Sequence, residues 1–207
     1  MNPETSHPRD LPGRYGRVVL DLERLLHSTQ TLAVVAGGWA VWRHGYVGRV
    51  TQDVDIVVPK DKLEELRSVA SICGFDFFQP PEGRWPKLVH RQTLIDVDLL
   101  PEMGIPGTPS HPAPIAIKHP AAYDAVQGRL EYISLGGLVE LKLGASRAKD
   151  IADIIELIKV RHSRNHGDNT NVKSEELLEI TEYLALAHTS YAKRFLELIQ
   201  QAREEES

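Results

Sequence analysis

The stretch that decides the fold, residues 36–58, reads AGGWAVWRHGYVGRVTQDVDIVV. A short apolar run, residues 32–36, leads into it and stops at the paired glycines Gly37 and Gly38. The pattern predicts a strand, a glycine turn and a short helix that ends near Gly45. Residues 54–58 alternate apolar and acidic side chains at their start and predict a second strand. The segment therefore predicts a glycine turn and a short helix, followed by a strand whose start carries acidic residues.

Two of these acids, Asp53 and Asp55, are two residues apart in an extended segment, so both carboxylates project from the same face of the sheet. Side-by-side carboxylates repel each other unless a cation lies between them, and oxygen ligands of this kind suit Mg²⁺. The paired glycines allow backbone amides to approach a phosphate, and the helix after them adds its N-terminal amides. We expect a metal site and a phosphate site to be neighbours.

A third acid can come from the predicted strand at residues 93–100, where Asp96 and Asp98 share a face. Three convergent carboxylates can hold a metal pair that activates an attacking oxygen and stabilises a leaving pyrophosphate. The spacing alone leaves open which of the two acids completes the set.

The remaining periodicities divide the chain in two. Residues 1–134 are predicted to form an α/β body, with helices over 13–28 and 61–73 and further strands near 75–79 and 87–91. The proline-rich and glycine-rich connection 101–120 is expected to carry one short strand at 115–117. Residues 135–207 are predicted to be helical, with helical periodicity over 138–143, 151–158 and 177–199 and a polar separator at 161–170.

Composition limits the class of protein. The chain has 207 residues, a net charge of −5 and 42% hydrophobic residues, which excludes a disordered, collagenous or coiled-coil protein and one that coats nucleic acid by bulk charge. The single cysteine, Cys73, excludes an internal disulfide and a cysteine zinc site. The N-terminus lacks a signal-peptide pattern, and no stretch approaches the roughly 20 apolar residues of a membrane span. We expect a cytoplasmic protein without membrane contact.

The ordered set of Gly-Gly, Asp-x-Asp and a later acidic strand resembles the nucleotidyltransferase superfamily that includes DNA polymerase β. More narrowly, it is similar to the minimal nucleotidyltransferases related to AbiEii-type toxins of toxin–antitoxin systems. The matching blocks cover about residues 33–58, 93–101 and 135–158. The resemblance implies a mixed sheet flanked by helices, and transfer of a nucleoside monophosphate (NMP) from a nucleoside triphosphate (NTP) with Mg²⁺ or Mn²⁺.

The resemblance also implies roles for the acids and glycines. Asp53 and Asp55 would bind the metals, and Asp98 or Asp96 would contact the metal and the incoming nucleophile, with Asp98 preferred. Gly37 and Gly38 would bind the triphosphate. Many relatives have Gly-Ser at this place, so here the backbone amides would act without a hydroxyl.

The other nucleotide-binding residues implied by the resemblance are Arg49, Thr51 and Lys142. Lys142 would neutralise triphosphate charge, and Arg49 would do similar work nearer the acids. Two simpler alternatives remain open: Lys142 lies on a solvated helix face, and the charges at 147–153 form surface ion pairs. Similarly, His44 can serve as a cation at the end of a helix.

The sequence leaves the acceptor open among an RNA 3′ end (tRNA included), a protein side chain and a small hydroxylated molecule such as an antibiotic. A toxin role with an antitoxin partner follows from the resemblance alone. One rival is a catalytically silent nucleotide-binding or partner-binding protein, which the clustered acids disfavour. The other is a metal-dependent phosphohydrolase, which the lack of histidines beside the acids disfavours.

Overall fold

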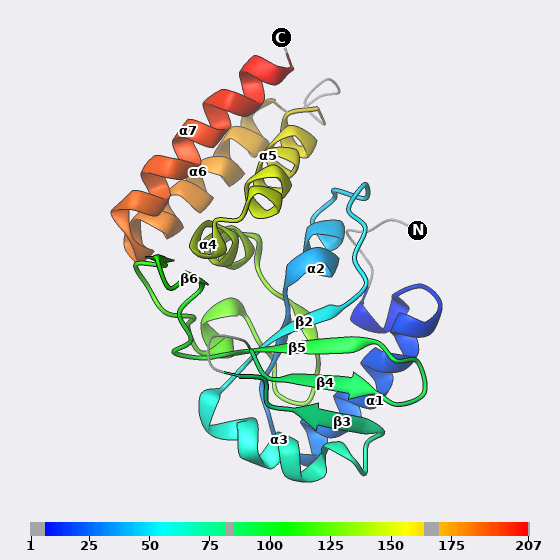
Figure 1. Ribbon diagram of the computed structural model, residues 1–207. Coiled ribbons are helices and arrows are strands. Elements are labelled where there is room, and N and C mark those ends of the chain that lie inside the picture. The colour runs from blue at the N-terminus through cyan, green and yellow to red at the C-terminus, as the bar shows by residue number, and fades with distance from the viewer. Residues whose placement is uncertain (1–6, 82–84, 164–169, 207) are drawn as a thin grey trace.

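The computed structural model describes residues 7–81, 85–163 and 170–206. Its centre is a six-stranded sheet in the order β3-β4-β5-β2-β1-β8 (Figure 1). The strands are β1 Val34–Val35, β2 Val54–Val58, β3 Phe75–Phe78, β4 Lys87–His90, β5 Asp96–Pro101 and β8 Glu131–Tyr132. β2 pairs with β5 and β1 with β8 in parallel, while the other pairs are antiparallel. The expected mixed sheet flanked by helices is confirmed.

One face of the sheet is covered by α1 (Arg14–Ser28) and α3 (Leu63–Ala70), which lie below it in Figure 1. Alternate residues of β2 and β5 face these helices in one buried cluster, because successive side chains of a strand point to opposite faces. The cluster includes Val54, Ile56, Val58, Val97 and Leu99. The residues between them, Asp55 and Asp98 among others, therefore face the opposite side.

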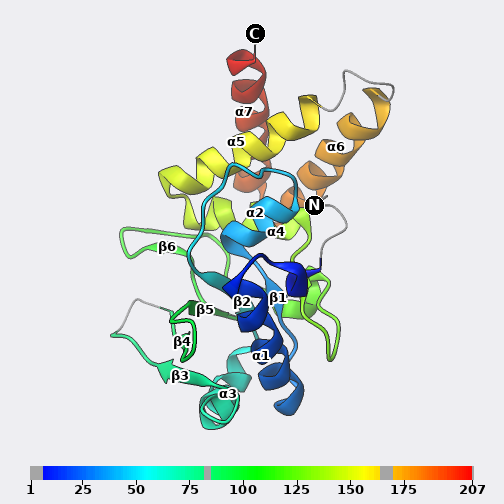
Figure 2. The ribbon, with the colours of Figure 1, turned by 90° about the vertical axis from the view of Figure 1, so that its right-hand side faces the viewer.

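That opposite side carries the helical part of the chain. The helices are α2 Gly37–Arg43, α4 Leu135–Ala145, α5 Ala148–Ser163, α6 Thr170–Ala187 and α7 Thr189–Glu205. Helices α4 to α7 are stacked above the sheet and share their own buried cluster (Figures 1 and 2). The expected C-terminal helical region is confirmed.

Three details differ from the sequence-based expectation. The strand expected at 115–117 is absent, and the same connection instead forms a small hairpin of β6 (Gly107–Thr108) and β7 (His111–Pro112). The helical stretch 177–199 is broken at His188, whose ring accepts a hydrogen bond from the backbone N–H of Ser190 and caps α7. Of the expected separator 161–170, residues 161–163 belong to α5, and 164–169 lie outside the described residues.

The expected boundary near residue 134 falls just before α4, but the apolar core crosses it. A third buried cluster joins Val34 and Val57 of the sheet to Leu138 of α4 and Leu157 of α5. The division into two domains stays a prediction. In the described parts of the chain, no helix has the length and apolar character needed to span a bilayer.

Candidate active site

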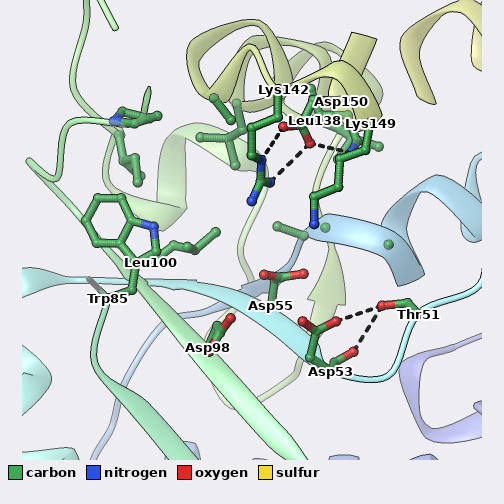
Figure 3. Close-up of a pocket in the computed structure, with 18 of the residues that line it drawn as sticks. Thr51, Asp53, Asp55, Trp85, Asp98, Leu100, Leu138, Lys142, Lys149 and Asp150 are labelled. Atoms are coloured by element: carbon green, nitrogen blue, oxygen red, sulfur yellow. Dashed lines mark hydrogen bonds and ion pairs between the residues drawn. The ribbon is translucent and has the colours of Figure 1, made fainter. Parts of the chain in front are cut away.

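A pocket with a cavity volume of about 370 Å³ lies over β2 and β5, on the face opposite α1 and α3, and is closed by α4 and the start of α5. Every candidate site residue from the sequence lines it except Asp96. The candidates that line it are Gly37, Gly38, Arg49, Thr51, Asp53, Asp55, Asp98 and Lys142. Figure 3 shows Asp53, Asp55 and Asp98 on the sheet side of the pocket, and Lys142 and Lys149 on the helical side together with Asp150.

The acids form one wall because of the strand register. Asp55 and Asp98 are direct partners in the parallel pairing of β2 with β5, and Asp53 immediately precedes β2. Burial and then the neighbouring charges of Asp53 and Asp98 raise the pKa of Asp55 to about 7. Burial, followed by the charges of Asp53 and Asp96, also raises the pKa of Asp98. The three carboxylates therefore repel one another across a short space.

The donor set of this wall consists only of carboxylate oxygens, which are the ligands that Mg²⁺ and Mn²⁺ prefer. Within residues 7–81, 85–163 and 170–206, however, no three Asp, Glu, His or Cys side chains are already arranged as a metal-binding group. The chemistry of the wall thus fits a divalent cation, and the metal centre itself stays a proposal.

Asp96 stands apart from this wall. Its Oδ2 lies 2.6 Å from the Nζ of Lys87 on the neighbouring strand β4. The side chain is 40% exposed and does not line the pocket. Of the two acids that the sequence left open, only Asp98 faces Asp53 and Asp55.

Only glycine fits at positions 37 and 38, because β2 and the loop that precedes it lie very close to them. Gly37 has a φ of +58°, and a Cβ at this position would lie 1.7 Å from Oδ2 of Asp55. A Cβ at Gly38 would lie 2.6 Å from Cβ of Thr51. Any larger residue at either position would push the acidic strand and its leading loop away from α2.

The opposite wall of the pocket is basic and partly buried. Lys142 on α4 is only 5% exposed, and its Nζ lies 2.7 Å from Oδ2 of Asp153 and 3.3 Å from Oδ1 of Asp150. Arg49 reaches the same group, with its Nε 3.3 Å from Oδ1 of Asp153. The alternatives of a solvated Lys142 and of surface ion pairs are therefore wrong for Lys142, Asp150 and Asp153.

Two further cations complete this wall. Arg147 donates two hydrogen bonds to Asp150, and these, with the charge of Lys142, lower the pKa of Asp150 although burial opposes the change. Lys149 is exposed and extends from the helical side toward Asp53 and Asp55 in Figure 3. An acidic wall thus faces a basic wall across the pocket.

His44 lies outside the pocket, at the end of α2. Its Nε2 is 2.8 Å from the carbonyl oxygen of Ile133, and burial is the main cause that lowers its pKa to about 4. The lowered pKa and the contact with Ile133 disfavour the interpretation of His44 as a helix-end cation.

The far end of the pocket is apolar and was missed by sequence reasoning. It is lined by Trp85, Leu100, Ile105, Ile117, Leu138 and Leu141. No signal in the sequence marks Trp85, which precedes β4 without a periodic neighbour. The helical residues could have been found, because the apolar run at 138–143 directly follows the strand-rich part of the chain.

Comparison with known proteins finds no matching family model and no matching curated protein. Among solved structures, one match is the crystal structure of ANT(2″)-Ia in complex with adenylyl-2″-tobramycin, with 18% identity, a TM-score of 0.43 and coverage of 92% of this chain and 98% of that one. The solution structure of the antibiotic-resistance factor ANT(2″)-Ia matches with 17% identity, a TM-score of 0.45 and coverage of 91% of both chains.

A third match is the crystal structure of an antigenic nucleotidyltransferase-like protein from Paracoccidioides brasiliensis. It has 15% identity, a TM-score of 0.40 and coverage of 86% of this chain and 91% of that one. The similarity is distant in all three cases.

Proposed function

We propose that the chain is a metal-dependent nucleotidyltransferase that moves NMP from an NTP to an acceptor hydroxyl. The observation that carries the proposal is the pairing of an acidic wall, Asp53, Asp55 and Asp98, with a basic wall across one pocket. A magnesium triphosphate combines two cationic centres with a polyanion, and a pocket with both kinds of wall complements both of its parts.

In this proposal Asp53, Asp55 and Asp98 would hold Mg²⁺ or Mn²⁺, which supplies charge stabilisation for the attacking and leaving oxygens. Gly37 and Gly38 let the backbone come close to the phosphates, while Lys149, Arg147 and the buried Lys142 neutralise their charge.

The same pocket orders the chemical step. Asp98 accepts the proton of the acceptor hydroxyl, and the freed oxygen forms a bond to the α-phosphorus of the NTP. The bond from that phosphorus to the bridging oxygen breaks, and pyrophosphate leaves along the basic wall. The wall is preorganised for this charge, because Asp150 and Asp153 already fix Lys142 in place.

The finer parts of the proposal rest on the sequence resemblance. These are a toxin role with an antitoxin partner and the acceptor, which is an RNA 3′ end, a protein side chain or a small hydroxylated molecule. The proposed cytoplasmic location rests instead on the sequence pattern of the N-terminus and on the lack of a long apolar stretch. Burial and the charges of neighbouring carboxylates raise the pKa values of Asp55 and Asp98, so clustering these acids costs stability. A catalytically silent protein would have no use for such a cluster, which counts against the silent-scaffold rival.

The experiment that tests the proposal incubates the protein with each α-labelled NTP and Mg²⁺ in the presence of total RNA, protein or aminoglycosides. We expect label to move to one acceptor class with wild type and to be lost with Asp53→Ala. The matched control is Asp76→Ala, which removes an exposed acid on β3 that pairs with Arg91. No transfer under any condition, or equal transfer by Asp53→Ala, would refute the proposal.

A further inference from the structure

Thr51 lies where the loop after α2 enters β2, and the family resemblance assigns it to nucleotide binding. In the structure its hydroxyl already has a partner: Oγ1 donates a hydrogen bond of 2.8 Å to Oδ1 of Asp53 (Figure 3). This bond is made within the protein, to the carboxylate at the start of the acidic wall. The contact points to an action of Thr51 through Asp53.

Neighbouring helices hold Thr51 in place. Its carbonyl oxygen accepts a hydrogen bond of 3.3 Å from the hydroxyl of Tyr15 on α1. The Tyr15 ring packs edge-on against Trp39 of α2, with ring centroids 4.8 Å apart. Through Tyr15, both α1 and α2 therefore support the backbone at Thr51, next to the hydroxyl that contacts Asp53.

The second observation concerns Gly38. Unlike Gly37, it is not among the glycines with positive φ, so its backbone conformation is open to other residues. The obstacle is Thr51, because a Cβ at position 38 would lie 2.6 Å from Cβ and 2.7 Å from Oγ1 of Thr51. The side chain of Thr51 therefore occupies the space that a side chain at position 38 would need.

We propose that Thr51 is a positioning residue whose hydroxyl orients Asp53, and that positions 51 and 38 share one side-chain space, so that only one of them can carry a side chain there. The first part rests on the proposed function, since it concerns a carboxylate proposed to bind metal. Partners of this kind around a metal ligand typically contribute 10-fold to 100-fold in metal affinity or activity.

The first experiment compares Thr51→Val with Thr51→Ser. Valine keeps the branched shape over Gly38 and removes the donor, whereas serine keeps the donor and removes the methyl group. We expect Thr51→Val to weaken Mn²⁺ binding to the NTP-free protein about 10-fold by calorimetry, to lower kcat, and to leave the KM for NTP nearly unchanged. Thr51→Ser should retain most of the affinity.

The control for loss of a threonine hydroxyl is Thr181→Val on α6, where the hydroxyl donates to the carbonyl of Leu177 within the helix. It should bind Mn²⁺ like wild type. If Thr51 only fills space, Thr51→Ser will be the weaker variant. If it contacts the nucleotide directly, Thr51→Val will raise the KM for NTP with unchanged Mn²⁺ affinity. Either result overturns the positioning role.

The second experiment tests the shared space with Gly38→Ser, Thr51→Gly and the double variant. Gly38→Ser alone forces its Cβ onto Thr51, and Thr51→Gly alone removes both the hydroxyl and the Cβ. The double variant relieves the collision and restores a hydroxyl beside Asp53. We expect its Mn²⁺ affinity to exceed that of either single variant by about 5-fold, and its thermal midpoint to exceed that of Gly38→Ser.

Additive losses in the double variant would overturn the shared-space claim. A wild-type protein that binds no Mn²⁺ and transfers no label would refute the proposed function, and with it the orientation of a metal-binding Asp53. In that case the thermal midpoints of the four proteins still decide whether positions 38 and 51 share one space.

Discussion

At the scale of single residues, Asp98 and Asp96 share a strand and a face but have different neighbours. Asp98 lies beside Asp55 in the pocket, whereas Asp96 pairs with Lys87 outside it. We expect Asp98→Asn to retain Mg²⁺-NTP binding and to lose transfer, because the proton acceptor is gone. Asp96→Asn should stay partly active, since it changes only an ion pair next to the site.

Calorimetric titration with Mg²⁺-NTP and single-turnover transfer separate these two effects. The reverse order of the two variants would move the proton acceptor to Asp96. Full activity of both variants would remove the third carboxylate from the mechanism.

Lys142 has a second role that its burial imposes. Replacement by Met keeps the stem and removes the charge that faces two nearly buried carboxylates, Asp150 and Asp153. Removing one partner of a buried ion pair typically destabilises by about 3 kcal/mol or more. We therefore expect Lys142→Met to lower both the free energy of unfolding and the NTP affinity. Denaturant titration checks the first, and an unchanged midpoint would contradict it.

Some features of the candidate site were predictable from the sequence, and others were not. The shared face of Asp53 and Asp55, and that of Asp96 and Asp98, was predictable because strand alternation fixes the face on which each carboxylate lies. The difference between Asp98 and Asp96 was not, because it depends on the pairing of β5 with β2 and β4. The burial of Lys142 was not predicted, because its ion pairs with Asp150 and Asp153 join α4 to α5 and form only in the folded chain. The contact of Thr51 with Gly38 was not predictable either, because it joins a loop to a helix at a distance that only the folded backbone sets.

At the scale of elements, α2 is joined to the rest of the molecule through His44. The ring faces the Ile133 carbonyl, and the His44 carbonyl accepts a hydrogen bond of 3.1 Å from Arg161 of α5. The folded state favours the neutral ring, because burial lowers its pKa from 6.5 to about 4. This contribution to stability is present above pH 6.5 and is lost as the pH falls toward 4.

We expect the free energy of unfolding to decrease by about 2 kcal/mol between pH 6.5 and pH 5 from this group. His44→Gln keeps a donor toward Ile133 without a titrating ring, so its stability should change less over the same range. Denaturant titrations of both proteins at several pH values measure the difference. Parallel pH profiles would assign the slope to other groups.

Long elements were predictable, and short ones only in part. Strand β2 and helix α1 follow the expected ranges closely, because five or more residues give a readable period. Strands β1 and β8 have two residues each, too few for periodicity. The apolar run 32–36 nevertheless predicted β1, whereas β8 was not predicted at all. The hairpin of β6 and β7 likewise replaced the strand expected at 115–117.

At the scale of the whole molecule, the shared apolar cluster makes the sheet and the helices depend on each other. Leu138 and Leu157 pack with Val34 and Val57, so a cut before α4 would expose the upper face of the sheet. We expect the fragment 1–134 not to reach the native fold and the full chain to unfold in one transition. Circular dichroism of the fragment and calorimetry of the chain check this. Two separate calorimetric transitions would support two domains.

The pairing of β1 with β8 has a consequence for the order in which the chain assembles. Val34 pairs in register with Glu131, so this side of the sheet cannot form until residues roughly 100 positions later in the chain are available. Contacts between segments far apart in sequence slow folding, because the loop between them must first be ordered. During synthesis on a ribosome, α2 and its glycines would emerge long before the strand that secures them. Folding of the nascent chain should therefore finish late, after the residues of α4 have left the exit tunnel.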